Sequence, residues 1–127
     1  MTAKYIQKGE SLDYLNLTDK KITAGEVVDL VTRIGVAGCD IAPGAVGSVE
    51  VTGVFEMAKS GKSALPMGTA LYFDGTGITG ETEGTAEAAD GQADAEGSGG
   101  KTANIPAGYA AASASADAKT VKVKLLG

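Results

Sequence analysis

The sequence has no histidine and no tryptophan, and it holds a single cysteine. Histidine is the commonest general base and metal ligand in proteins, so its absence excludes histidine-based catalytic triads and histidine-ligated metal sites. One cysteine, Cys39, excludes an intramolecular disulfide and a zinc site built from cysteines. Because an unpaired cysteine usually behaves as a small apolar residue, Cys39 is predicted to be buried.

Large apolar side chains are also scarce in this chain of 127 residues. Aromatic residues make up 5% of the chain, and Leu, Ile, Val and Phe together make up about a fifth, which is near the lower limit for a stable core. The length indicates one domain that spans residues 1–127. A core this small predicts that the protein gains stability from a partner, either copies of itself or a larger surface.

The net charge of −5 is concentrated in one segment, residues 81–100. This segment has no basic residue, no aliphatic side chain larger than alanine, and six acids: Glu81, Glu83, Glu87, Asp90, Asp94 and Glu96. Such a composition cannot bury enough apolar surface to offset the entropy of ordering, so the segment is predicted to be a flexible acidic loop within the domain. The basic residues outside it are scattered, which predicts no nucleic-acid partner. No apolar run is long enough to span a bilayer and the first residues do not form a signal peptide, so no membrane partner is expected either.

Apolar and polar residues alternate along several segments, which is typical of strands with one buried and one solvent-exposed face. The alternation predicts strands at residues 27–36, 49–57, 70–73 and 121–126. No segment of helical length has an apolar stripe with a period of 3.6 residues. The fold is therefore predicted to be all-β.

A short pattern, Ile/Leu-x-x-Gly-x-aliphatic, occurs four times and contains all three prolines of the chain. The copies span residues 22–27, 41–46, 65–70 and 105–110. Proline and glycine at these spacings favour tight turns, so each copy is predicted to be a turn that leads into a strand. The regular spacing predicts a small β-barrel or β-sandwich, with the acidic Gly/Ala-rich segment inserted into one hairpin.

Two glycine patterns resemble phosphate-binding motifs but lack the rest of the motif. Residues 75–80 match G-x-G-x-x-G, yet the acidic segment follows them where a dinucleotide fold needs a helix. Gly61-Lys62-Ser63 resembles the end of a P-loop, but Glu56 stands where the first glycine is required. No cofactor-binding residues are therefore predicted.

No catalytic or metal-binding residues are predicted, and the chain is expected not to be an enzyme. Serine and threonine are abundant, but without histidine no nucleophile and base can be assigned as a pair. Five acids outside the loop could in principle form a two-carboxylate hydrolase, but the chain has too few aromatic residues for a sugar-binding cleft. These acids, interpreted here as surface residues, are Asp13, Asp29, Glu50, Glu56 and Asp74.

The order of the turns and strands resembles the tailed-phage capsid cement family, also called head decoration proteins and formerly a domain of unknown function. The segments that carry the resemblance are residues 5–10 (YIQKGE), 22–28 (ITAGEVV), 49–57 (VEVTGVFEM), 67–74 (MGTALYFD) and 120–125 (TVKVKL). The chain departs from the family pattern in the acidic segment and in the alanine-rich residues 109–118. Members are sometimes labelled as recombinases, and the incomplete P-loop argues against that label.

The resemblance implies a structural protein that is made in the bacterial cytoplasm, binds the exterior of a mature phage head and bridges neighbouring copies of the major capsid protein. Decoration proteins commonly sit at local threefold positions, so a homo-oligomer, and specifically a trimer, is expected. The N-terminal arm, residues 1–10, is the expected capsid contact, through Lys4, Tyr5, Ile6 and Lys8. The alternatives are another phage structural module, such as a tail or fibre component, and a small hydrolase or nucleotide-binding protein.

Overall fold

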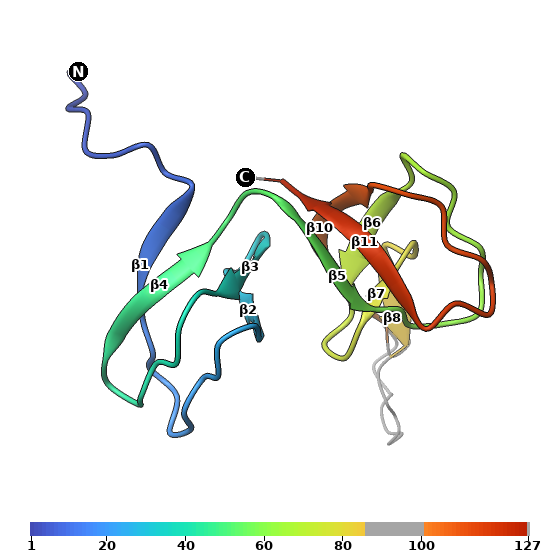
Figure 1. Ribbon diagram of the computed structural model, residues 1–127, viewed down its shortest axis with the longest axis horizontal. Helices are drawn as coiled ribbons and strands as arrows, with labels where there is room; N and C mark the ends of the chain where they lie inside the picture. The colour runs from blue at the N-terminus through green and yellow to red at the C-terminus, as the bar shows by residue number, and fades with distance from the viewer. Residues whose placement is uncertain (86–100, 127) are drawn as a thin grey trace.

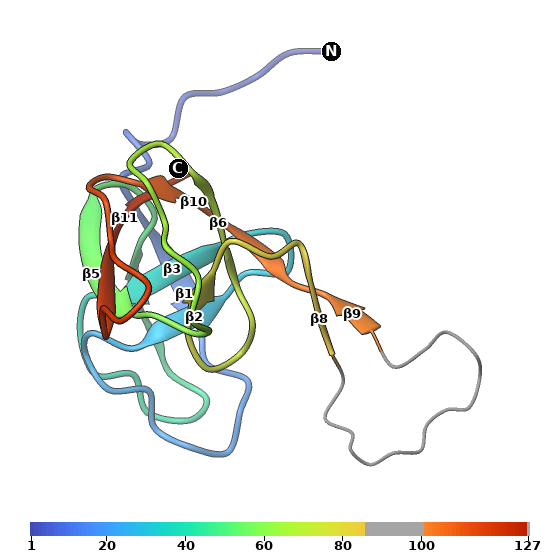
Figure 2. The ribbon, with the colours of Figure 1, turned by 90° about the vertical axis from the view of Figure 1, so that its right-hand side faces the viewer.

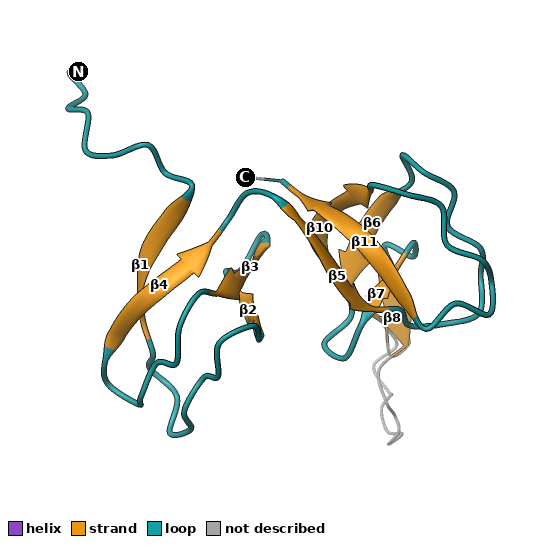
Figure 3. Ribbon diagram, viewed as in Figure 1, coloured by secondary structure: helices purple, strands orange, loops and turns teal. Residues whose placement is uncertain are grey.

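The computed structural model describes residues 1–85 and 101–126. Within these residues the chain forms eleven strands and no helix (Figures 1 and 3). Most of the predicted acidic loop, residues 86–100, lies outside the described residues, whereas residues 83–85 form a strand. The prediction of an all-β fold is confirmed.

The strands form two main antiparallel sheets and a small ribbon. The first sheet has the order β1-β4-β3-β2, and its strands are β1 (Ser11–Leu15), β2 (Val27–Asp29), β3 (Ile34–Ala37) and β4 (Val46–Glu50). The second has the order β5-β11-β10-β6-β7, with β5 (Val54–Ala58), β6 (Ala70–Phe73), β7 (Ile78–Thr79), β10 (Ile105–Ala110) and β11 (Thr120–Leu125). The ribbon pairs β8 (Glu83–Thr85) with β9 (Lys101–Ala103) and extends away from the sheets (Figure 2). Neither main sheet closes into a barrel in the described part of the chain, so the architecture fits the β-sandwich.

The two main sheets are two copies of one topology. Strands β1, β2, β3 and β4 of the first sheet correspond, in chain order and in sheet order, to β5, β6, β10 and β11 of the second. The pairing registers correspond as well, since Ser11 opposite Glu50 matches Val54 opposite Lys124. We call residues 10–51 the first repeat and residues 53–125 the second repeat. Strands β7, β8 and β9 interrupt only the second repeat, between β6 and β10.

Backbone hydrogen bonds outside the strand ladders also occur in matching pairs. In the first repeat an isolated bridge joins Ile22 to Ile41, with N···O distances of 2.9 and 2.7 Å; in the second repeat Leu65 and Ala114 exchange two bonds of 2.8 Å. Three further backbone bonds of the first repeat have a counterpart in the second. Gly25 N to Ala37 O matches Gly68 N to Ala110 O, and Asn16 N to Ala45 O matches Lys59 N to Lys119 O. Val51 N to Glu10 O matches Leu125 N to Gly53 O. The fold is therefore an internal duplication, although the sequence pattern indicated only recurring turns.

Each repeat encloses an apolar cluster, and strand β3 contributes to both. The first cluster consists of Val28, Ala37, Ile41, Val49 and Val51, which lie on the inner side of the first sheet. The second cluster is larger and contains the inward-facing apolar residues of β5, β6, β10 and β11, such as Met57, Leu71, Ala110 and Val123. Ile34 and Val36 point to the other side of β3 and are buried in this second cluster. The first repeat therefore helps to cover the core of the second.

Two predicted strands are in fact broken. The predicted strand at 27–36 is a hairpin of β2 and β3, whose turn places Val31 at a φ of +77° although it is β-branched. The predicted strand at 49–57 is divided between β4 and β5, which belong to different sheets (Figure 1). In both cases the alternation of apolar and polar residues continues through the break, so the pattern alone could not locate it.

Of the four predicted turns, three are confirmed and the fourth is wrong. Residues 23–26, 42–45 and 66–69 are tight turns closed by hydrogen bonds between their first and last residues. The copy at 105–110 is instead strand β10, in which a β-bulge occurs between Pro106 and Gly108. A Cβ atom at Gly108 would collide with the carbonyl oxygen of Lys124, so glycine is required here for close approach of two strands. The matching turn of the second repeat lies at residues 115–118, which contain neither glycine nor proline.

Asn16 is the one fully buried polar residue in the described chain, and its side chain connects the loops of the first repeat. Its Nδ2 donates to the carbonyl oxygens of Lys20 and Ile41 at 2.8 and 2.9 Å. Its Oδ1 accepts from the backbone nitrogen and the hydroxyl of Thr18 at 2.9 and 2.6 Å. All four hydrogen-bonding positions of the amide are therefore used. Lys59 occupies the matching place in the second repeat, where its Nζ donates to the carbonyl oxygen of Ala116 at 3.1 Å.

Replacing Asn16 with alanine should destabilise the protein strongly. The carbonyl groups of Lys20 and Ile41 would each lose a donor and the Thr18 backbone nitrogen would lose its acceptor, which typically costs about 2–3 kcal/mol in total. Thermal or denaturant unfolding measures this change. Asn104→Ala is the matched control, because the Asn104 amide donates to Glu81 in a more exposed place and should contribute about 1 kcal/mol or less. Equal losses for the two variants would contradict the central role of Asn16.

Candidate interaction surface

The N-terminal arm lies outside both sheets. Residues 1–9 have no regular secondary structure, and the chain joins the first sheet only at β1, an edge strand (Figure 2). Tyr5 and Ile6 are 79% and 75% exposed. Gln7 donates a 3.3 Å hydrogen bond to the carbonyl oxygen of Ser11, and Lys8 lies 4.0 Å from a carboxylate oxygen of Glu10. Apolar side chains that the body leaves exposed are available to a partner.

The four residues predicted to contact a capsid are thus neighbours on one exposed segment. Lys4, Tyr5, Ile6 and Lys8 are all exposed, and they combine an aromatic ring, an aliphatic side chain and two positive charges. No partner is present in the structure, so their role stays a prediction.

Gly75 and Gly77 lie in the hairpin turn between β6 and β7, and Gly80 follows β7. Asp74 Oδ1 accepts hydrogen bonds from the backbone nitrogens of Thr76 and Gly77 at 2.9 and 2.8 Å, and from the Thr76 hydroxyl at 3.0 Å. A phosphate would need these amide groups, but a carboxylate of the chain already holds them. The turn is therefore structural.

These hydrogen bonds change the pKa of Asp74. Partial burial acts to raise the pKa of its carboxyl group, but hydrogen bonds from the backbone of Thr76 and Gly77, and from the hydroxyls of Ser60 and Thr76, lower it further than burial raises it. The net result is a pKa below the usual value for aspartate. The charged form of Asp74 thus stabilises the fold.

A basic hollow that sequence reasoning missed lies on the second repeat. Lys59, Lys62 and Lys119 line it together with Asp117, around a volume of about 440 Å³. The Lys59 ammonium is held by the carbonyl oxygens of Gly61 and Ala116. Because Lys119 is distant in sequence from the other two lysines, charge patterning along the chain could not reveal this cluster.

Cys39 is exposed, so the prediction that it is buried is wrong. It lies in the irregular segment between β3 and Ile41. Residues 38–40 of this segment are exposed, whereas Ile41 is buried in the first cluster. Its Sγ lies 4.0 Å from the hydroxyl oxygen of Ser48. Cysteine is small enough to be either buried or exposed in such a loop, and composition does not indicate which of the two applies.

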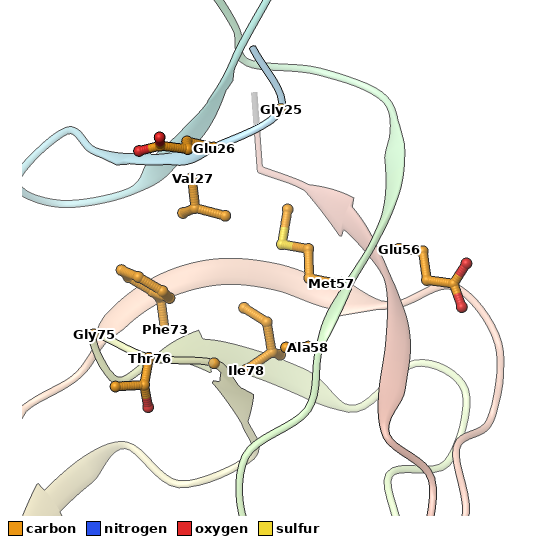
Figure 4. A pocket seen from close by; sticks show the side chains of 11 residues that line it. Gly25, Glu26, Val27, Glu56, Met57, Ala58, Phe73, Gly75, Thr76 and Ile78 are labelled. Carbon is orange, nitrogen blue, oxygen red and sulfur yellow. The ribbon is translucent and has the colours of Figure 1, made fainter. Parts of the chain in front are cut away.

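The seam between the two repeats contains an apolar groove of about 370 Å³ (Figure 4). Val27 of the first repeat faces Met57, Phe73 and Ile78 of the second across this groove. Glu26 and Glu56 also line it. The groove is the margin of the shared core, because Val27, Met57, Phe73 and Ile78 also belong to or pack against the second cluster.

The described residues contain no group of three or more histidine, cysteine, aspartate or glutamate side chains placed to hold a metal ion. In the same part of the chain no helix is long and apolar enough to cross a membrane.

A comparison with protein-family models assigns the chain to a known family. The family model for phage cement proteins matches residues 6–125 of the 127 residues, so the chain belongs to the phage cement protein family. No curated protein and no solved structure matches the chain. Membership confirms the resemblance inferred from the turns and strands, and it assigns the chain to a structural family associated with the phage capsid. It also favours a capsid component over a tail or fibre component.

Removing the Asp74 carboxylate should weaken the fold in a pH-dependent way. The lowered pKa means that the contribution of Asp74 is complete above the usual aspartate pKa of about 4 and is lost as the pH falls through the lower folded-state value. Asp74→Ala should therefore reduce the free energy of unfolding at pH 7 by about 1 kcal/mol, and the difference from wild type should shrink below about pH 4.

Denaturant unfolding between pH 2.5 and 7, at pH values chosen to bracket the usual aspartate pKa of about 4, measures both effects. Asp19→Ala, which removes an exposed carboxylate from a loop, is the control and should show neither. A constant difference between Asp74→Ala and wild type across this range would argue against the stabilising charge.

Proposed function

We propose that this cement protein binds the exterior of the mature phage head and stabilises it by bridging neighbouring copies of the major capsid protein. Family membership supports the capsid as the site of action. The bridging role is our inference from the shape of the molecule: an arm extends from one repeat, while the second repeat lies on the other side of the seam (Figure 1). Two separated contact regions allow one copy to engage two coat subunits.

The observation that carries this proposal is the exposed arm. Tyr5 and Ile6 would bury most of their apolar surface on a partner, and each such side chain contributes about 1.5–3 kcal/mol when fully buried. Lys4 and Lys8 flank them and favour an acidic partner surface. Because an arm without regular secondary structure loses conformational entropy on docking, only part of this energy strengthens binding.

The mechanism is the addition of many modest contacts over a symmetric shell. Each copy that bridges two coat subunits raises the free energy needed to separate them locally. A shell presents many equivalent sites, so even a modest energy per copy stabilises the whole head. No chemical step is involved, which agrees with a structural family.

Deleting residues 1–8 should abolish binding to mature heads and leave the fold intact, because strand β1 begins at Ser11. The assay is co-sedimentation of purified protein with expanded heads and with unexpanded heads of the same phage. Wild-type protein should bind expanded heads saturably, and the saturation level gives the number of copies per coat subunit.

A pair of double variants refines this test. Tyr5→Ser with Ile6→Ser should weaken binding at least tenfold, whereas Leu17→Ser with Met67→Ser, at two exposed apolar sites on the body, should bind as wild type. Unchanged binding after deletion of the arm would remove these four residues from the capsid contact. Failure of the wild type to bind either form of the head would overturn the proposed function.

A further inference from the structure

The contact between the two repeats is asymmetric, because each repeat uses a different surface. The first repeat contributes the outer face of β2 and β3, which presents Val27, Ile34 and Val36. We call this the donor face. The second repeat contributes Phe55 and Met57 of β5 and Phe73 of β6, which we call the acceptor edge. Val36, Phe55 and Met57 line a single groove along this contact.

Since the repeats share one topology, each also has a copy of the surface that it does not use. Strand register identifies the unused donor face of the second repeat as Ala70, Tyr109 and Pro106. The pair of Ala70 and Tyr109 takes the place of Val27 and Val36. Pro106 takes the place of Ile34, because Pro106 is paired with the second residue after Ala70 and Ile34 with the second residue after Val27. The unused acceptor edge of the first repeat consists of Leu12, Tyr14 and Leu30, at the places of Phe55, Met57 and Phe73.

Both unused surfaces are mostly apolar and at least partly exposed to solvent. Tyr109 is 46% exposed, and Ala70 and Pro106 beside it are also exposed. The cross-strand row from Tyr109 continues through Lys124 to Val54, which is 54% exposed. On the acceptor edge Leu12 is 42% exposed, while Tyr14 and Leu30 are half-buried. Exposed aromatic and aliphatic residues on a sheet face are typical of a protein interface.

We infer that copies of this chain bind one another head to tail, with the donor face of the second repeat in one copy packed against the acceptor edge of the first repeat in the next. This contact would repeat between chains the packing that joins the repeats within a chain. An asymmetric contact of this kind forms a ring when its rotation closes and an open filament when it does not. The inference specifies the interface of the expected homo-oligomer, and it does not depend on capsid binding.

Cysteine cross-linking tests the asymmetry of the contact. All variants carry Cys39→Ser, which removes the only native thiol. Leu12→Cys and Tyr109→Cys correspond to Phe55 and Val36, which line one groove, so the two thiols should meet only between different copies. Under mild oxidation a mixture of the two variants should form disulfide-linked dimers with one chain of each type, and neither variant alone should do so. Leu17→Cys, at an exposed residue of the loop after β1, replaces Tyr109→Cys in the control mixture and should not cross-link.

Sedimentation of the purified protein gives an independent readout. Wild-type protein should form an oligomer that dissociates on dilution. Tyr109→Glu should weaken it at least tenfold, and Leu17→Glu, with the same charge change at another exposed apolar residue, should leave it unchanged. Circular dichroism confirms that each variant is folded.

Three outcomes would overturn the inference: a monomeric wild type at all concentrations, dimers of Tyr109→Cys alone as abundant as those of the mixture, or equal cross-linking by Leu17→Cys. These results are separate from those for capsid binding, because no heads are present in either experiment. Loss of head binding with an intact oligomer would reject the proposed function and keep this interface.

Discussion

The fold depends on the bridge that closes each repeat. Ile22 and Ile41 in one repeat, and Leu65 and Ala114 in the other, exchange two backbone hydrogen bonds that hold two turns together over the inner side of a sheet. This closure buries the bridge residues themselves, with Ile41 at 1% and Leu65 at 3% exposure. A four-stranded sheet with few large side chains thereby acquires a covered face, which an open sheet of this composition would lack.

Small residues make that closure possible. At Gly47 a Cβ atom would collide with the side chain of Ile41, and at Gly35 it would collide with Val49. The first cluster therefore achieves close packing through glycine where other proteins use larger apolar residues, and it remains small. Burial of Ile34 and Val36 against the second repeat adds apolar contact that neither sheet provides alone. The same shortage of apolar surface explains why exposed residues such as Tyr5 and Tyr109 are expected to contact partners.

Sequence reasoning was successful where the residues of a segment determine its conformation without help from the rest of the chain. In β11 the valines face the core and the lysines face solvent, so alternation alone predicted the strand. It failed where the conformation of a segment depends on its pairing with other strands. The turn at 30–33 has neither proline nor glycine, and its conformation follows from the pairing of β2 with β3. Conversely, Pro106 and Gly108 suggested a turn, but pairing with β6 and β11 on both sides holds them in a strand.

The duplication and the interaction surfaces were hidden for a related reason. Asn16 and Lys59 occupy matching places with unlike side chains, and strands β7 to β9 interrupt one repeat only. The two repeats therefore show no evident similarity in amino-acid sequence beyond the recurring turns. The lysines of the basic hollow and the residues of the unused donor face of the second repeat become neighbours only when distant strands pair. The arm was predictable because its exposure follows from its own composition and its place before the first strand.

Electron cryomicroscopy of mature heads decorated with this protein would test the account most directly. The account predicts density on the outer surface of the coat shell, into which both sheets fit, with residues 1–10 in contact with the coat and each copy touching two neighbouring coat subunits. Density confined to the inner surface, or copies that each touch a single coat subunit, would contradict it.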